Sequence, residues 1–297
     1  YKSFLINDFA AHMAPLSIGT QTNGSVIRPA SYCGVVGYKP SYGLISRSGV
    51  MRQSDKLDHI GVFGKTVEDV ALFAKSLIKK DLYDPSTIHY AADEMLNVCK
   101  KGPIYEPKFI FYKTKNWKNI DKESQKSFDF FIKTFSKNIE VFDTPSYFDD
   151  IPKYHKIIHE TDMANNFQGY YKKSKKFLSK EMVSAIERGL KYSAKEYAEA
   201  IDFMKRSYES YKEVFEDFHG VLTPSSSGVA PKGLKSTGSP EFSTIWTYMG
   251  LPSISLPLLI GANNLPLGIQ LVGDKLDDLR FLGVANWLEK NCKKYAK

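Results

Sequence analysis

The chain has 297 residues, of which 42% are hydrophobic and 25% charged, and this composition is ordinary for a globular protein with a substantial core. The sequence has no run of eighteen apolar residues, which is the pattern that would predict a membrane-spanning helix, so no membrane association is expected. The net charge of +8 comes from scattered lysines with only six arginines, which argues against direct nucleic-acid binding.

The cysteines and histidines do not predict a metal or disulfide site. Cys33, Cys99 and Cys292 lie far apart, which fits a reducing cytoplasm better than a disulfide framework. His155 and His159 share one face of a predicted helix, but no third ligand accompanies them. We therefore expect no metal, no other cofactor and a cytoplasmic protein.

Residues 10–65 are rich in Gly, Ser and Pro, and they predict short strands joined by tight loops. Thr66 and Asp69 then form a capping-box pattern at the start of a helix that runs to about residue 78. A strand–helix–strand pattern, typical of a parallel sheet, follows at 108–112, 122–135 and 139–142.

The region 152–216 is dense in Lys, Glu, Tyr and Phe. It predicts two or three amphipathic helices, broken near Gly169 and Gly189, that could cap the site. Three strands and a last helix are predicted after it, at 220–224, 253–259, 267–273 and 277–290. Because Pro252 and Pro257 accompany the second of these strands, we expect it to be an edge or bulged strand.

No internal repeat or linker divides the sequence. The simplest prediction is therefore a single domain over residues 1–297, of the α/β class, with helices around the sheet.

The stretch from Gly19 to Ala30, GTQTNGSVIRPA, has the composition of a catalytic loop. Ser25 follows Asn23 and Gly24, two residues that adopt left-handed backbone angles at little cost. Such a turn can direct several N–H groups into one small space, which binds an anion. A serine hydroxyl beside that space is the arrangement of a nucleophile next to an oxyanion hole. A plain loop of small residues is the alternative.

This stretch continues as SYCGVVGYKPSYG over residues 31–43, and related blocks follow at 57–69 and 250–273. Together they resemble the signature of the amidase-signature family of serine hydrolases. The region 100–215 carries little of the likeness. The resemblance implies an α/β fold with a mixed central sheet flanked by helices on both faces.

The resemblance also implies a Ser–Ser–Lys triad, in which Lys is the base and a second Ser relays the proton. Ser25 matches the attacking serine, and the backbone N–H groups of Thr22, Asn23, Gly24 and Ser25 match the oxyanion hole. Asn23 departs from the family pattern, which usually has Gly there. Its side chain would narrow the space beside the substrate carbonyl.

The triad Lys and the relay Ser are not visible in this sequence. The family places them well upstream of the nucleophile, and Lys2, Ser3 and Lys39 are poor matches. We therefore expect either the carboxy-terminal part of a longer amidase, lacking the amino-terminal part, or an inactive descendant of one.

Arg28 lies three residues after Ser25, immediately before Pro29. One interpretation is a structural salt bridge. The other is that its guanidinium binds a substrate carboxylate through two hydrogen bonds.

Three functions remain open. The first is hydrolysis of a small-molecule amide through a Ser25 acyl-enzyme. The second is the amidase component of a tRNA-dependent amidotransferase, ranked lower because residues 237–247 look more like the free-standing amidases. The third is a non-catalytic protein that binds a ligand or a partner. A homodimer is one assembly that these functions allow.

Overall fold

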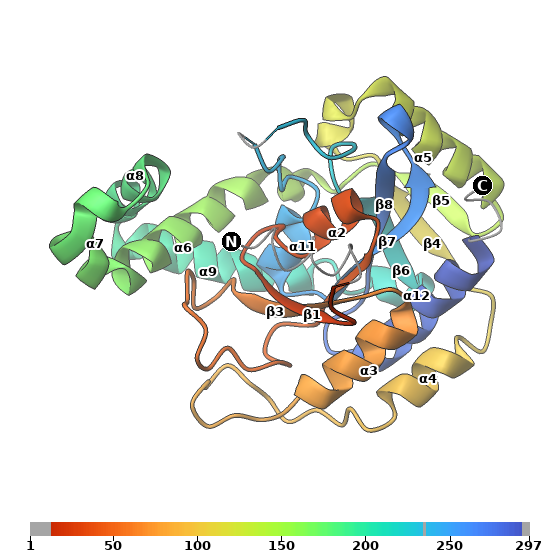
Figure 1. Cartoon of the computed structure of the whole chain (residues 1–297), viewed down its shortest axis with the longest axis horizontal. Helices are drawn as coiled ribbons and strands as arrows, with labels where there is room; N and C mark the ends of the chain where they lie inside the picture. The colour runs from red at the N-terminus through yellow and green to blue at the C-terminus, as the bar shows by residue number, and fades with distance from the viewer. Residues whose placement is uncertain (1–12, 234–235, 293–297) are drawn as a thin grey trace.

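The computed structural model describes residues 13–233 and 236–292. One mixed sheet of eight strands runs through the molecule (Figure 1). In spatial order the strands are β1 (Ser17–Gln21), β3 (His59–Gly64), β2 (Val36–Lys39), β7 (Ser253–Ile260), β8 (Pro266–Val272), β6 (Gly220–Pro224), β4 (Phe109–Tyr112) and β5 (Ile139–Phe142). Strand β4 is parallel to both β5 and β6, and the remaining pairs are antiparallel.

Both faces of the inner strands of the sheet are buried, as alternate residues of β4 show. Phe109 and Phe111 belong to one apolar cluster, whereas Ile110 and Tyr112 belong to a second. Because successive strand residues point to opposite faces, the two clusters lie on opposite sides of the sheet. The predicted α/β class, with a mixed sheet and helices on both faces, is confirmed.

Four helices contribute to the first cluster: α3 (Val67–Leu77), α4 (Met95–Lys101), α5 (Lys122–Thr134) and α12 (Asp278–Cys292). The second cluster contains side chains from α6 (Ile151–Asn166), α9 (Ala194–Glu209), α10 (Val214–Asp217) and α11 (Thr244–Met249). Short 3-10 turns occupy Lys115–Asn119, Ser146–Asp150, Lys175–Phe177 and Ala262–Asn264.

The helical region predicted over 152–216 is present, and part of it projects from the body. Helices α7 (Gln168–Ser174) and α8 (Lys180–Gly189) extend to the left of the sheet in Figure 1. Met163, Phe167 and Ile186 form a small separate apolar cluster there. The break between α6 and α7 falls at Phe167, close to the predicted position.

One sequence expectation about the sheet region was wrong in part, and a second, that the strand at 253–259 is an edge or bulged strand, was confirmed. Residues 10–65 contain a helix, α2 (Ile27–Cys33), in addition to strands. Strand β7 is not an edge strand, because it pairs with β2 on one side and β8 on the other. It is bulged, however, since its register with β8 shifts between Leu256 and Leu259, on either side of Pro257.

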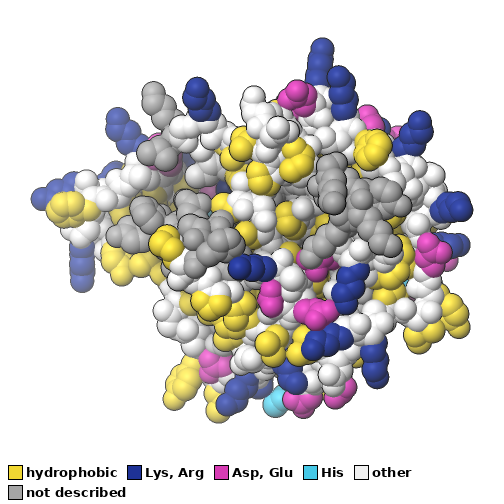
Figure 2. Space-filling model, turned by 45° about the vertical axis from the view of Figure 1, so that its right-hand side comes forward, with side chains coloured by type: hydrophobic (Ala, Val, Ile, Leu, Met, Phe, Trp, Pro, Cys, Tyr) yellow, Lys and Arg dark blue, Asp and Glu magenta, His cyan; other side chains and the backbone are white. Residues whose placement is uncertain are grey.

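The surface agrees with the scattered lysines of the sequence. On the face drawn in Figure 2, Lys and Arg side chains are dispersed among acidic and apolar ones and form no single stripe. Within residues 13–233 and 236–292, none of the helices is both long and apolar enough to cross a membrane.

Candidate active site

Ser25 lies in the turn between β1 and α2, on the face of the sheet that α2 and α11 cover. It is half-buried, and its Oγ makes no hydrogen bond with any described residue. A serine hydroxyl that is accessible and not engaged in the fold is available to an incoming ligand.

The start of α2 is held by a side chain from β1 instead of by a local cap. The fully buried Gln21 accepts the N–H groups of Val26 at 2.8 Å and Ile27 at 3.0 Å through Oε1. Its Nε2 donates to Thr247 Oγ1 at 2.9 Å. The first turn of α2, which follows Ser25, is therefore fixed from β1 and from α11.

Three successive carbonyl groups before Ser25 are each held by a separate donor. His155 Nε2 lies 2.9 Å from the oxygen of Thr22. Thr247 Oγ1 donates to the oxygen of Asn23 at 2.5 Å, and an N–H of α2 donates to the oxygen of Gly24 at 3.1 Å. The three peptide planes from Thr22 to Ser25 are thus oriented by α6, α11 and α2 respectively.

The N–H groups of the same three peptides are available. In a trans peptide the N–H points away from the carbonyl oxygen, and the described peptide bonds are all trans. Within the described ranges, the N–H groups of Asn23, Gly24 and Ser25 donate to no residue. Consecutive backbone donors beside a serine hydroxyl can stabilise an oxyanion.

The expected left-handed backbone is absent from this turn. Neither Asn23 nor Gly24 has a positive φ. Gly24 is needed for a close approach instead, because a Cβ atom there would lie 2.9 Å from Pro240 Cβ. The amide oxygen of Asn23 accepts a hydrogen bond from Thr244 at 2.8 Å, which fixes its side chain.

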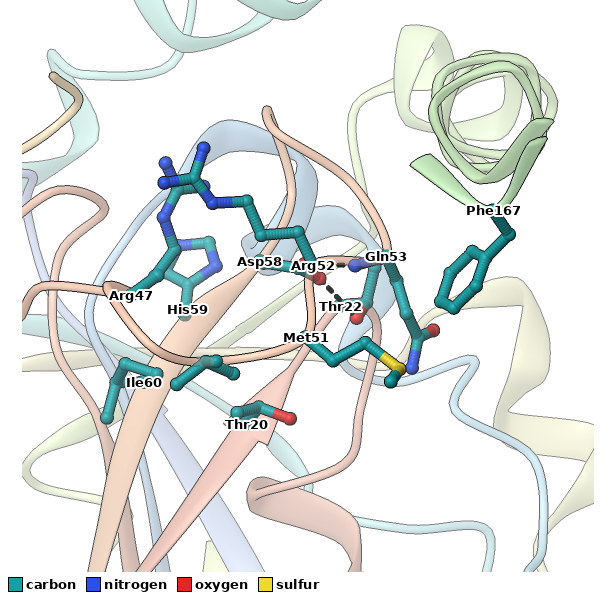
Figure 3. A pocket seen from close by; sticks show the side chains of 11 residues that line it. Thr20, Thr22, Arg47, Met51, Arg52, Gln53, Asp58, His59, Ile60 and Phe167 are labelled. Carbon is teal, nitrogen blue, oxygen red and sulfur yellow. Dashed lines mark hydrogen bonds between the residues drawn. The ribbon is translucent and has the colours of Figure 1, made fainter. Parts of the chain in front are cut away.

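Thr22 joins the nucleophile loop to a neighbouring cavity of about 250 Å³. Its hydroxyl donates to Asp58 Oδ1 at 2.6 Å, and Asp58 Oδ2 accepts the N–H group of Gln53 at 2.6 Å (Figure 3). The same Oδ2 also accepts the N–H group of Ser54 at 3.0 Å. The lining residues are Thr20, Thr22, Arg47, Val50, Met51, Arg52, Gln53, Asp58, His59, Ile60 and Phe167, so Ser25 itself lies outside this cavity.

Arg28 is a half-buried cation on the first turn of α2. Burial lowers the pKa of its guanidinium, and Nη2 lies 3.5 Å from Thr237 Oγ1. It forms no salt bridge with the residues of known placement, so the structural salt bridge considered above is not found there. A partly desolvated cation without an ionic partner favours binding of an anionic group.

Lys39 is a structural residue. Its fully buried Nζ donates to the carbonyl of Leu251 at 2.5 Å, and burial lowers its pKa to about 7. Lys2 and Ser3 lie outside the described residues. His155 and His159 belong to no cluster of three metal-ligand side chains in the described part of the chain.

Sequence reasoning missed Gln21, Asp58, His155 and Thr247, the residues that hold the loop. From its sequence context, His155 was considered only as a possible metal ligand. Its contact with Thr22 spans 133 positions, and that of Thr247 with Asn23 spans 224. No local pattern signals such contacts.

Comparison with known proteins places this geometry in a family. A family model described as Amidase matches residues 9–282. A glutamyl-tRNA(Gln) amidotransferase subunit of Alkaliphilus metalliredigens is 30% identical, over 95% of this chain and 64% of that protein. The corresponding protein of Mycoplasma genitalium is 27% identical, over 95% of this chain and 67% of its own length. The chain thus spans about two thirds of these curated relatives.

Solved structures agree with the fold. A glutamyl-tRNA(Gln) amidotransferase subunit of Thermotoga maritima matches with a TM-score of 0.79 and 26% identity, over 97% of this chain and 64% of that one. A structure described as a vestigial protein complex related to an s-triazine catabolic enzyme matches with a TM-score of 0.85 and 21% identity, over 97% and 65%. With its sheet, its Ser25 loop and a family match over residues 9–282, this chain belongs to the amidase family.

Proposed function

We propose that this chain takes part in the hydrolysis of small-molecule amides, with Ser25 Oγ as the nucleophile. The observation that carries the proposal is the row of N–H groups of Asn23, Gly24 and Ser25, which donate to no described residue while the carbonyls of their peptides are fixed. Such preorganised donors stabilise negative charge on a carbonyl oxygen during acyl transfer.

The chemistry would proceed in two steps. Ser25 Oγ forms a bond to the amide carbon and loses its proton to a base, while the carbonyl oxygen gains negative charge beside the backbone donors. The C–N bond then breaks, the leaving nitrogen takes up a proton, and water hydrolyses the acyl-enzyme. The resemblance assigns the base to a Lys acting through a second Ser, and no described residue hydrogen-bonds to Ser25 Oγ.

The backbone N–H groups of Thr22, Asn23, Gly24 and Ser25 form the proposed oxyanion hole, and Arg28 is the proposed substrate-binding residue. Arg28 supports a substrate with a carboxylate, because its cation is half-buried and lacks an ion pair among the described residues. A bound substrate carboxylate would form the ion pair that the partly buried Arg28 guanidinium does not make with the described residues.

Labelling with a fluorophosphonate probe tests the nucleophile. We expect folded protein to be labelled at Ser25, and Ser25→Ala to abolish labelling. Ser227→Ala is the matched control, since Ser227 is another half-buried serine, in the loop that follows β6. Absence of labelling in folded wild-type protein would favour a non-catalytic binding protein.

A second candidate is the amidase component of a tRNA-dependent amidotransferase. The names of the curated relatives favour it, because they are amidotransferase subunits. This candidate predicts glutaminase activity that depends on a co-purifying tRNA-binding partner. The small-molecule hydrolase predicts activity of the chain without such a partner, as a monomer or homodimer.

We place either enzyme in the cytoplasm because the three cysteines are widely spaced.

A further inference from the structure

Helix α6 presents three polar side chains on one face. His155, His159 and Asp162 have the spacing i, i+4, i+7 along the helix. His155 is 3% exposed and Asp162 is 7% exposed. Buried polar groups cost free energy unless they are hydrogen-bonded. The hydrogen-bond partners of His155 and Asp162 therefore show which part of the protein this face of α6 stabilises.

The partner of His155 is the main chain three residues before Ser25. Its Nε2 lies 2.9 Å from the oxygen of Thr22, and a carbonyl oxygen can only accept. Nε2 therefore carries the proton. Burial lowers the pKa of His155 to about 4, so the ring is neutral near pH 7 and donates through Nε2 alone.

Asp162 is connected to the side chain of Thr22 through a chain of hydrogen bonds. Ser54 Oγ donates to Asp162 Oδ2 at 2.5 Å, and the N–H of Ser54 donates to Asp58 Oδ2 at 3.0 Å. Asp58 Oδ1 in turn accepts the hydroxyl of Thr22 at 2.6 Å. Tyr197 of α9 donates to the second oxygen of Asp162 at 2.8 Å. Helix α6 thus fixes both the carbonyl and the side chain of Thr22.

The orientation of the Thr22 carbonyl determines the orientation of a proposed catalytic donor. In the trans peptide that joins Thr22 to Asn23, the N–H of Asn23 points away from the oxygen that His155 holds. Rotating this peptide would move that N–H away from its present direction. An oxyanion donor acts only when it is aimed before the reaction begins.

We propose that His155 is a positioning residue, which aims the N–H of Asn23 by holding the carbonyl of Thr22. This inference rests on the proposed function of the Ser25 loop. It gives the helical region, where family resemblance is weakest, a direct role in preparing the site. The alternative is a histidine that only fills and satisfies the core.

The test compares two substitutions of His155. His155→Leu removes the donor but keeps an apolar side chain in the core. His155→Gln keeps a donor of similar reach. We expect His155→Leu to slow fluorophosphonate labelling of Ser25 at least tenfold and to lower kcat more than it raises KM. His155→Gln should stay within about threefold of wild type, because its side chain can still donate to the carbonyl of Thr22. The tenfold effect expected for His155→Leu is smaller than the hundredfold cost of losing an oxyanion donor entirely, because the N–H of Asn23 would be misaimed and not absent.

Hydrogen exchange over residues 21–26 supplies a readout independent of catalysis. We expect faster exchange in His155→Leu and near-normal exchange in His155→Gln. His219→Leu is the matched control, because this half-buried histidine lies just before β6 and accepts the N–H of Lys108, and it should change neither exchange nor labelling. If His155→Leu fails to fold, His155→Asn, which is too short to reach Thr22, takes its place.

The outcomes separate the two proposals. Folded His155→Leu with wild-type exchange and wild-type labelling would overturn the positioning role. Wild-type protein that never labels would overturn the proposed function, while altered exchange in His155→Leu would still support the role of His155 in holding the loop.

Discussion

The side chain of Gln21 bridges two helices that are far apart in the sequence, because its Nε2 donates to Thr247 Oγ1 at 2.9 Å while its Oε1 accepts two N–H groups of α2. No Ser, Thr, Asp or Asn caps this helix. Gln21 therefore performs the capping role from the end of β1, and it fixes the start of the helix directly after the nucleophile.

Gln21→Met should destabilise the protein and disturb Ser25. Methionine matches the length of the side chain but leaves two buried N–H groups unsatisfied, so we expect a loss of about 3 kcal/mol in urea unfolding. Labelling of Ser25 should fall as well. Gln125→Met is the matched control, since the half-buried Gln125 donates two hydrogen bonds of 3.0 Å to carbonyl oxygens outside the Ser25 loop, those of Trp117 and Ile120. It should lower stability without slowing labelling, and equal effects on labelling would contradict this role of Gln21.

Gly24→Ala should impair the site more than it impairs the fold. The new Cβ would lie 2.9 Å from Pro240 Cβ and 3.2 Å from its Cα, so either the nucleophile loop or the Pro240 segment must shift. We expect labelling of Ser25 to fall at least tenfold. Gly169→Ala has nothing within 4 Å of its Cβ position and serves as the control. Wild-type labelling of Gly24→Ala would show that the close approach to Pro240 is relaxed in solution.

Elements with local signals were predictable from the sequence. The Thr66–Asp69 capping box is formed by reciprocal hydrogen bonds of 3.0 and 3.1 Å, and α3 begins where the pattern indicated. Strand β5 coincides with the predicted range 139–142. The sequence signals for both elements lie within a few positions of one another, although β5 also needs its partner β4.

Helices α2 and α11 could not be predicted, because their stability comes from distant partners. Helix α2 has seven residues and takes its N-terminal partner from Gln21. Helix α11 has six residues, all buried, and several of them belong to the second apolar cluster. The same holds for the candidate site: motif resemblance located Ser25, but His155 and Thr247 reach the loop only through tertiary packing.

Arg28→Ala should discriminate between substrates. If the guanidinium binds a carboxylate, its removal should raise KM for carboxylated amides about tenfold to a hundredfold, because hydrogen bonds to charged groups contribute about 1.5–3 kcal/mol. KM for a neutral amide of similar size should change little. Steady-state kinetics with such a substrate pair measures the difference. An equal effect on both substrates would assign Arg28 to the structure of α2 instead.

Asp84→Asn should remove stability in a pH-dependent manner. The buried Arg47 and Asp84 form a salt bridge of 2.8 Å, and this contact holds the pKa of Asp84 well below its usual range. The stabilisation is present above the usual carboxylate pKa and is lost as the pH falls below it. We expect a loss of about 3–5 kcal/mol at pH 7 and a smaller difference from wild type near pH 3. Asp129→Asn, in the exposed pair with Lys113, should cost less than about 1 kcal/mol.

Acid should weaken the fold through His155 over a defined pH window. Burial lowers its pKa from 6.5 to about 4, with His159 as the neighbouring titratable group. The unfolded chain therefore takes up this proton at a higher pH than the folded one, so stability is full above pH 6.5 and falls towards pH 4. Protonation of His155 should account for a loss of about 3 kcal/mol in the free energy of unfolding. His59, whose pKa burial also lowers, adds a loss of its own. Urea unfolding of His155→Gln should show a correspondingly smaller decrease between pH 7 and pH 4, whereas the exposed control His89→Gln should follow wild type. Parallel curves for His155→Gln and wild type would mean that the pKa of His155 is the same in the folded and the unfolded protein.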